Sequence, residues 1–367
     1  MRSFKNILIT GGAGFIGSNF IRTLLKKESP FTGRIINLDA LTYAGNAASL
    51  SDIVSEFGGN TSTAQYIFIH GNICDKELVN NIFKQYAIDA VVHFAAESHV
   101  DRSILGPEVF LQTNILGTFT LLEAAKIAWQ RKDGSMRDDV LFHHISTDEV
   151  YGSLGMEGYF QETTAYDPRS PYSASKASSD HLVKAYFHTY GLPITVSNCS
   201  NNYGPFQFPE KLIPLMILNM LEGKPLPVYG DGMQIRDWIH VEDHNRAVQL
   251  IMQKGRVGET YNIGGENEWA NIKLLHKLIA IVAEKAGLNR EKVIALITHV
   301  TDRLGHDRRY AIDCTKIKTE LGWTRTFNFE TGLAHTVDWY LQNKDWVTNV
   351  RSGEYRNWIE QNYSKRC

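Results

Sequence analysis

The chain has 367 residues, 43% of them hydrophobic and 21% charged, and these ordinary globular proportions exclude a disordered, collagen-like or coiled-coil protein. Its 38 basic and 40 acidic side chains leave a net charge of −2, so there is no electrostatic reason to expect binding to nucleic acid or to an anionic membrane. The length suits about two domains.

The first half of the chain alternates short β-branched runs with helical patterns, which predicts parallel β-α-β units. Strands are expected over residues 6–10, 34–39, 66–71, 90–95, 140–146 and 194–199. Helices are expected between them, over residues 15–27, 76–86, 113–130 and 173–190. Six parallel strands with intervening helices predict an α/β fold with a Rossmann-type doubly wound parallel sheet.

The pattern changes after Asn202. Residues 203–240 are rich in proline, glycine and aromatic residues, and the helix expected within them covers residues 211–221. A helix and then a strand pattern over residues 241–263 is predicted to return to the sheet, and helices are expected over 271–286 and 330–343. We therefore predict a first domain over residues 1–202 with 241–263. A smaller, discontinuous α/β domain is predicted over residues 203–240 and 264–362.

Neither a membrane span nor a signal peptide is expected. The longest apolar stretch, residues 212–221, is interrupted by Pro214 and Asn219, and the first apolar run leads directly into a glycine cluster without a small-residue cleavage pattern. The cysteines are widely spaced and include no C-x-x-C pair, which favours the reducing cytoplasm over a disulfide framework or a zinc site. They are Cys74, Cys199, Cys314 and Cys367.

Histidines occur near predicted strands, but none of them suggests a metal site. No two have a ligand spacing such as that of H-E-x-x-H, so we expect no bound metal. The histidines considered are His93, His99, His143 and His144.

A glycine-rich turn follows the first predicted strand. The segment TGGAGFIG over residues 10–17 places Gly11, Gly14 and Gly17 in a G-x-x-G-x-x-G pattern, and Gly12, Gly14 and Gly17 in G-x-G-x-x-G. Such glycines allow a tight strand-to-helix turn, close approach to a pyrophosphate and close helix packing. Many glycine-rich turns have only a structural role. Here the strand before the turn and the helix after it favour dinucleotide binding.

Asp39 ends the second predicted strand, 22 residues after Gly17. A carboxylate there accepts hydrogen bonds from ribose hydroxyls and repels a 2′-phosphate, which favours NAD over NADP. The alternative is a strand-ending aspartate that only shapes a turn.

Tyr172 and Lys176 form a Y-x-x-x-K pattern at the start of a predicted helix, on one face of it. A free tyrosine has a pKa of about 10, and a nearby ammonium and a positive nicotinamide ring are expected to lower it so that the phenolate accepts a hydroxyl proton. The same pattern often marks only a solvated helix face. Its position 25 residues after Thr147, which closes the fifth strand, makes it more specific.

Thr147, Asp148 and Glu149 follow the fifth predicted strand, at the sheet edge where open α/β sheets bind ligands. Alcohol oxidation needs only a hydroxyl, a tyrosine and a lysine, so two further carboxylates suggest additional proton transfers such as the elimination of water. The alternative is a helix cap with acidic residues in its first turn, and spacing alone does not decide between the two.

Taken together, these motifs resemble the extended short-chain dehydrogenase/reductases over residues 5 to about 345. The threonine–aspartate–glutamate triplet is similar to that of the nucleotide-sugar 4,6-dehydratases and separates them from sugar-nucleotide epimerases. The segments that carry the resemblance are TGGAGFIG (10–17), AAESHVDRS (95–103), ISTDEVYG (145–152), YSASK (172–176), CSNNYGPFQFPEKLIP (199–214), RDWIHVEDH (236–244) and DRLGHDRRYAID (302–313).

The resemblance implies an NAD-dependent hydro-lyase, a lyase of nucleotide-sugar metabolism that acts on dTDP-glucose. It implies that Tyr172, with Lys176 beside it, is the base at the sugar carbon-4 hydroxyl and that Thr147 binds the same hydroxyl. It further implies that Asp148 protonates the departing carbon-6 hydroxyl and that Glu149 removes the carbon-5 proton. The product would be a dTDP-4-keto-6-deoxyhexose.

The resemblance also implies two sets of binding residues, and it makes the first domain the NAD-binding one and the second the nucleotide-sugar-binding one. The NAD set is Gly11, Gly14, Phe15, Ile16, Gly17, Asp39, Ala40, Leu41, Thr42, Asn72, Ile73, Phe94, Ala95, Ala96, Ser98, Thr113, Tyr172, Lys176 and Asn202. The nucleotide-sugar set is Ser98, Thr147, Asn201, Lys211, Leu212, Pro227, Val228, Tyr229, Arg236, Asn271, Asp302, Arg303 and His306. Lys211, Arg236 and Arg303 suit the counter-charges of a diphosphate.

Three features depart from the family pattern. Asn72 stands where an aspartate is common, Leu304 replaces a frequent proline, and the insert around Gly33 and over residues 49–63 is longer than expected and receives no role. The alternatives of the same fold are a UDP- or GDP-sugar dehydratase, epimerase or decarboxylase. A non-catalytic NAD-sensing protein is a further alternative, but it would be expected to lack the tyrosine or the lysine.

A homodimer is expected. Helices 113–130 and 173–190 are apolar around much of their circumference, so one face can pack on the sheet while the rest needs a partner. In the family that the chain resembles, the corresponding helices pair into a four-helix bundle between subunits.

Overall fold

The computed structural model describes residues 1–26, 29, 31–59 and 64–351. Cys367, residues 60–63 of the insert and residues 352–362 of the predicted second domain lie outside the described residues.

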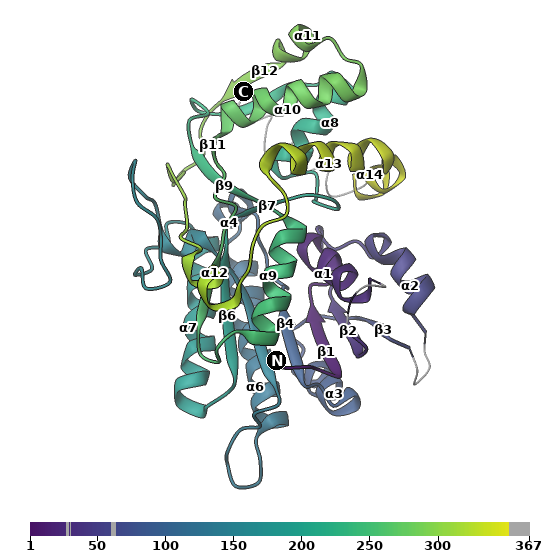
Figure 1. Ribbon diagram of the computed structural model, residues 1–367, viewed down its shortest axis with the longest axis vertical. Coiled ribbons are helices and arrows are strands. Elements are labelled where there is room, and N and C mark those ends of the chain that lie inside the picture. The colour runs from purple at the N-terminus through teal and green to yellow at the C-terminus, as the bar shows by residue number, and fades with distance from the viewer. Residues whose placement is uncertain (27–28, 30, 60–63, 352–367) are drawn as a thin grey trace.

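The centre of the molecule is a seven-stranded parallel sheet (Figure 1). Its strand order is β10-β6-β5-β4-β1-β2-β3, so the order reverses between β1 and β4 and opens a crevice at their carboxyl ends. The strands are β1 (Asn6–Thr10), β2 (Arg34–Asp39), β3 (Tyr66–His70), β4 (Ala90–His93), β5 (Leu141–Thr147), β6 (Ile194–Cys199) and β10 (Thr260–Ile263). The predicted Rossmann-type sheet is confirmed, and β10 adds a seventh strand.

Helices cover both faces of this sheet because alternate strand residues point to opposite sides. Ile7 and Ile9 of β1 belong to one apolar core, while Leu8 belongs to the other. The first face carries α1 (Phe15–Leu25), α9 (Val241–Lys254) and α12 (Thr315–Leu321). The second carries α3 (Lys76–Tyr86), α6 (Thr118–Trp129) and α7 (Pro171–Tyr190).

A second, smaller layer lies above the carboxyl ends of the strands in Figure 1 and has its own apolar core. Leu274 and Leu278 of one helix and Leu333 and Val337 of another are fully buried there. The helices of this layer are α8 (Leu212–Glu222), α10 (Asn271–Ala286), α11 (Arg290–Ile294), α13 (Phe329–Gln342) and α14 (Lys344–Val350). Residues 310–323, by contrast, pack Tyr310, Ile317 and Trp323 into the core of the large sheet.

Two small sheets accompany the large one, and although short strands are expected after Gly264, the sequence analysis set no bounds for any of them. The orders are β11-β9-β7, with one antiparallel and one parallel pair, and β12-β8. The strands are β7 (Asn201–Tyr203), β8 (Leu226–Tyr229), β9 (Ile235–His240), β11 (Glu268–Ala270) and β12 (Ile297–Val300). In β9, Arg236 and Asp237 are both buried, so its sequence lacks the alternation that normally reveals a strand.

The long helix predicted over residues 113–130 is interrupted at its beginning. It starts with α5 (Glu108–Phe110) and a π-helical stretch, η2 (Leu111–Gly117), before α6 continues. The Asn114 side chain accepts from the Glu97 N–H at 2.9 Å and donates to the Glu97 carbonyl at 3.0 Å. The π-helical stretch η2 therefore carries the side chain, Asn114, that holds the loop after β4 in place.

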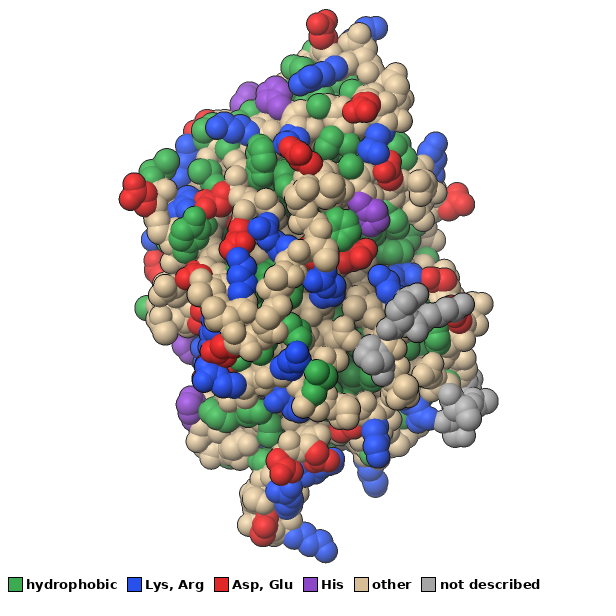
Figure 2. Space-filling view, in the orientation of Figure 1, with side chains coloured by type: hydrophobic (Ala, Val, Ile, Leu, Met, Phe, Trp, Pro, Cys, Tyr) green, Lys and Arg blue, Asp and Glu red, His purple; other side chains and the backbone are tan. Residues whose placement is uncertain are grey.

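Further short helices are η1 (Ala47–Leu50), α2 (Ser51–Phe57), α4 (Val100–Leu105) and η3 (Asp148–Tyr151). In the part of the chain that the structure describes, no helix is long and apolar enough to cross a membrane. On the face shown in Figure 2, acidic and basic side chains are interspersed over both layers.

Candidate active site

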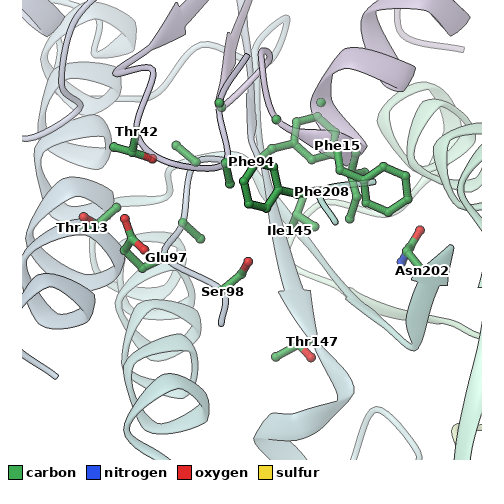
Figure 3. Close-up of a pocket in the computed structure, with 18 of the residues that line it drawn as sticks. Phe15, Thr42, Phe94, Glu97, Ser98, Thr113, Ile145, Thr147, Asn202 and Phe208 are labelled. Atoms are coloured by element: carbon green, nitrogen blue, oxygen red, sulfur yellow. The ribbon is translucent and has the colours of Figure 1, made fainter. Parts of the chain in front are cut away.

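A cavity of about 310 Å³ opens at the carboxyl ends of the central strands. Thr42 and Thr113 lie toward one end of it and Thr147 and Asn202 toward the other, with Phe94 between them (Figure 3). Every residue of the predicted NAD set lines this cavity except Leu41.

The glycine turn brings three backbone segments into contact. A Cβ atom on Gly11, whose φ is +71°, would lie 2.6 Å from the Ala95 nitrogen, and one on Gly17 would lie 2.3 Å from the Gly11 carbonyl oxygen. The first helix begins just after Gly14, which makes no side-chain cap hydrogen bond. Its first-turn N–H groups are therefore available to an anion in the cavity.

Asp39 stands at the end of β2 as the sequence analysis expects. Its two carboxylate oxygens accept backbone N–H bonds from Ala13 and Leu41, each at 2.8 Å. Burial raises the pKa of Asp39, and these two bonds act against the rise. Leu41 does not line the cavity, but its N–H positions the carboxylate that does.

Several cavity residues escaped the sequence analysis. Ile145, Gln207, Phe208 and Glu210 are among them. All four lie inside segments that carry the resemblance, over residues 145–152 and 199–214, but those segments were noted for other positions. Only the fold brings them to one place.

A second cavity of about 180 Å³ continues from the first, under the smaller layer. Five residues line both cavities: Ser98, Glu149, Asn201, Glu210 and Lys211. All of the predicted nucleotide-sugar set line the second cavity except Thr147, which lines the first, and Asp302. Residues that were not predicted here include His99, Asp101, Met216, Trp238 and Leu275.

Asp302 does not line the second cavity, but it contacts His306, which does. Its carboxylate lies 2.6 Å from Nδ1 of His306 and accepts from the Gln234 amide at 2.7 Å. His306 itself lines the cavity, and burial, with the charges of Arg303 and Arg236, lowers its pKa, while Asp302 acts against that lowering.

Three cationic side chains converge on the junction of the cavities. The Lys211 ammonium donates to the Ser98 carbonyl at 2.9 Å, and the Arg236 guanidinium donates to the Asp307 carbonyl at 3.0 Å and lies 4.2 Å over the Tyr310 ring. Arg303 keeps a buried Nε without a hydrogen-bond partner among the described residues. This concentration of positive charge suits a diphosphate.

Thr147, Asp148 and Glu149 occupy the end of β5 and the first turn of η3. The Thr147 hydroxyl accepts the Glu149 N–H at 3.3 Å and lies 3.3 Å from the Asp148 carboxylate, to which it donates. The cap geometry considered in the sequence analysis is therefore present, and it places both carboxylates against the cavity.

The two carboxyl groups have different electrostatic surroundings. Burial raises the pKa of Asp148 well above its usual value, and the charges of Glu149 and Asp237 raise it further. Burial also raises the pKa of Glu149, but Arg303, Arg236 and Lys211 act against that rise.

Tyr172 and Lys176 lie on one face of α7 and both line the first cavity. Lys176 donates to the Ile145 carbonyl at 2.7 Å. In the protein alone, burial and then the charge of Glu149 raise the pKa of Tyr172 well above its usual value. The sequence analysis expected Lys176 and the nicotinamide ring to lower the pKa of Tyr172. The protein without cofactor does not lower it. Within the described ranges, no group of three or more histidine, cysteine or acidic residues could hold a metal ion.

Comparison with known proteins agrees with this geometry. Residues 8–336 match the family model described as GDP-mannose 4,6 dehydratase. The chain is 55% identical to the dTDP-glucose 4,6-dehydratase of Salmonella typhimurium, over 98% of this chain and 99% of that one.

Two solved structures are also similar. The dTDP-glucose 4,6-dehydratase of Streptomyces venezuelae, solved with NAD bound, has a TM-score of 0.83 and 45% identity over 93% of this chain and 98% of that one. The enzyme of the same name from Bacillus anthracis, in complex with NAD, has a TM-score of 0.80 and 45% identity over 94% of this chain and 99% of that one. The chain belongs to the extended short-chain dehydrogenase/reductase family of nucleotide-sugar epimerases and dehydratases.

Proposed function

We propose that this member of the family catalyses the 4,6-dehydration of dTDP-glucose, as an NAD-dependent hydro-lyase. The identity of 55% over nearly the whole chain supports this function. The observation that carries it within the structure is the pair Asp148 and Glu149 at the junction of the two cavities, because oxidation alone requires neither carboxylate.

The first cavity fits NAD. The helix N-terminus after Gly14 suits the pyrophosphate and Asp39 suits the adenosine ribose. At the far end, the buried Oδ1 of Asn202 has no hydrogen-bond partner in the described part of the chain and suits a polar group. NAD bound there would supply the redox chemistry of the reaction, the reversible acceptance of a hydride from the sugar.

The second cavity would hold the nucleotide and its diphosphate. Lys211, Arg236 and Arg303 supply positive charge at its junction with the first cavity, and Asn271 offers a buried Oδ1 without a partner among the described residues. The sugar would then extend toward Glu149, where the two cavities meet.

Tyr172 would accept the proton of the carbon-4 hydroxyl, and Thr147 would orient that hydroxyl. Because burial raises the pKa of Tyr172 in the protein alone, the positive charges of Lys176 and of the bound nicotinamide would have to stabilise the phenolate. Tyr172 would therefore act as a base only when NAD is bound.

The carbon-4 ketone acidifies the proton on carbon 5. Burial raises the pKa of Glu149, but the cations Arg303, Arg236 and Lys211 oppose that rise and favour its carboxylate form, which would remove the carbon-5 proton. Asp148, kept protonated by burial, would give its proton to the carbon-6 oxygen, so that the hydroxyl leaves as water. Addition of a hydride at carbon 6 and return of a proton to carbon 5 would then saturate the double bond, and the product is dTDP-4-keto-6-deoxyglucose.

The decisive experiment incubates the purified protein, loaded with NAD, with dTDP-glucose and measures the alkali-developed absorbance of the keto sugar. Parallel incubations with UDP-glucose and GDP-mannose test the other nucleotide sugars. We expect conversion of dTDP-glucose and none in the matched control Tyr172→Phe, which keeps the ring but loses the base. Conversion of another nucleotide sugar alone would reject the proposed substrate.

We also propose a homodimer. Leu116, Phe119 and Ile127 of η2 and α6 are between 44% and 61% exposed, and Leu105 and Leu111 nearby are also exposed. An apolar stripe of this kind is typical of a surface that another subunit covers. Cytoplasmic location is our further proposal, since Cys74, Cys199 and Cys314 are all free thiols.

A further inference from the structure

The tyrosine and lysine of α7 are followed, one turn further along the same helix, by a buried carboxylate. Tyr172, Lys176 and Asp180 are spaced four residues apart and so share one helix face. Lys176 is 5% exposed and Asp180 is 0% exposed. A fully buried carboxylate is costly unless it is hydrogen-bonded and paired with a positive charge.

Two hydroxyl groups and a histidine ring lie against Asp180, whose Oδ1 has no hydrogen-bond partner among the described residues. Its Oδ2 accepts from the Ser146 hydroxyl at 2.7 Å and from the Tyr166 hydroxyl at 2.9 Å, and its Oδ1 lies 3.1 Å from Nε2 of His144. Burial by itself would raise the pKa of Asp180, but His144 and Lys176, together with the Ser146 bond, hold it below its usual value. Asp180 is therefore ionised at neutral pH.

His144 stands between this carboxylate and the lysine. The same Nε2 that lies 3.1 Å from Asp180 lies 3.5 Å from the Lys176 ammonium. Burial lowers the pKa of His144 to about 4, so the ring is neutral and adds no positive charge.

The titratable groups around Lys176 belong to several elements. Tyr172 and Asp180 face it from α7, His144 from β5, His93 from β4 and Cys199 from β6. Burial lowers the pKa of His93 and raises those of Tyr172 and Cys199, which leaves all three neutral. Among these groups Asp180 alone is negatively charged at neutral pH.

We propose that Asp180 is a positioning residue of the reaction. Its carboxylate, with His144 in between, is the counter-charge that keeps the Lys176 ammonium protonated and held on the Ile145 carbonyl beside Tyr172. This inference rests on the proposed function, because it concerns the lysine that supports the proposed base.

The first test compares the pH profile of kcat in the wild type and in Asp180→Asn. Loss of the counter-charge makes Lys176 give up its proton more readily, so the alkaline limb moves to lower pH by about one unit. The KM for dTDP-glucose stays within about twofold, because Asp180 lines neither cavity. Asp180→Glu restores part of the shift, and the surface control Asp338→Asn shows none.

The second test requires no activity. Thermal unfolding is measured for Asp180→Asn, for Lys176→Met and for the double variant. Each single change leaves one buried charge without its partner, whereas the double change removes both charges. We therefore expect the double variant to unfold at a higher temperature than the two separate losses would predict by addition.

The outcomes separate this inference from the proposed function. If the wild type does not convert dTDP-glucose, the proposed function is wrong. The thermal unfolding of the single and double variants still tests whether Asp180 and Lys176 are coupled. If the wild type is active while Asp180→Asn keeps its pH profile and the two losses simply add, the inference is wrong. If Asp180→Asn does not fold, folding of the double variant with Lys176→Met supports the inference. If the double variant also fails to fold, the inference is wrong.

Discussion

Asp148 and Glu149 are adjacent in the chain and burial raises the pKa of both, but more cationic side chains act on Glu149 than on Asp148. Asp148 is 2% exposed and has a buried Oδ2 without a partner among the described residues, and its neighbours Glu149 and Asp237 are themselves carboxylates. Arg236 lowers the pKa of both groups, whereas Arg303 and Lys211 act in addition on Glu149. The cations therefore favour ionisation of Glu149 over ionisation of Asp148.

The base can be tested with Glu149→Gln. We expect this variant to bind dTDP-glucose and to oxidise carbon 4, but to lose carbon-5 proton removal by about a hundred- to ten-thousand-fold. Single-turnover absorbance at 340 nm reports the oxidation, and deuterium wash-in from heavy water reports carbon 5. Wash-in at the wild-type rate would show that Glu149 is not the base.

The acid can be tested with Asp148→Asn, for which Glu149→Gln is the matched control. The variant should oxidise carbon 4 and still exchange the carbon-5 proton, because Glu149 remains. Loss of the carbon-6 hydroxyl should slow by about a hundred- to ten-thousand-fold. Rapid-quench mass spectrometry of the sugar would detect the stalled ketone, and undiminished water loss would contradict the assignment.

The sequence predicted those parts of the site that sit in short motifs. The glycine turn, Asp39 at the end of β2, and Tyr172 with Lys176 all follow from a local pattern next to a strand or helix. Their neighbourhood in space follows from the parallel sheet, since strand carboxyl ends meet at one edge.

Residues that reach the site through long-range packing could not be predicted in this way. Glu210 meets Arg102, 108 residues earlier in the chain, with Nε and Oε2 at 3.3 Å. The strand that carries Arg236 went unrecognised because its charged residues are buried at the site. The effect of burial on Tyr172 was also missed, because the spacing to Lys176 says nothing about how completely the ring is enclosed.

Cofactor selectivity should depend on Asp39. Asp39→Asn keeps the side-chain shape and one acceptor oxygen but removes the negative charge that repels a 2′-phosphate. We expect NAD affinity to fall about tenfold and the preference for NAD over NADP to shrink, as measured by isothermal titration of the cofactor-free protein. An unchanged preference would mean that another residue reads the ribose.

The subunit interface can be tested on α6. Phe119 is 44% exposed, and Phe119→Glu would place a charge in the apolar stripe, so we expect a dimeric mass for the wild type and a monomeric mass for the variant by light scattering. Val54→Glu on α2, where Val54 is 49% exposed, is the matched control and should stay dimeric. A monomeric wild type at micromolar concentration would reject the dimer.

The raised pKa of Asp148 also predicts how stability changes with pH. A carboxyl group whose pKa is higher in the folded protein stabilises the fold while it is protonated, and this contribution is lost as pH rises from the unfolded toward the folded pKa. Each unit of difference between the two pKa values corresponds to about 1.4 kcal/mol. Asparagine cannot ionise, so Asp148→Asn should gain stability relative to the wild type as pH rises.

Urea unfolding of both proteins at pH 5 and pH 8 measures this difference. The free energy of unfolding of Asp148→Asn minus that of the wild type should be larger at pH 8, because only the wild type must then hold a proton that its unfolded carboxyl group has lost, or else bury the charge. Asp338→Asn, on the surface of α13, should show the same difference at both pH values. A difference for Asp148→Asn that falls toward pH 8 would mean that the carboxyl group is stabilised in its ionised form, and the assignment of Asp148 as the acid would fall with it.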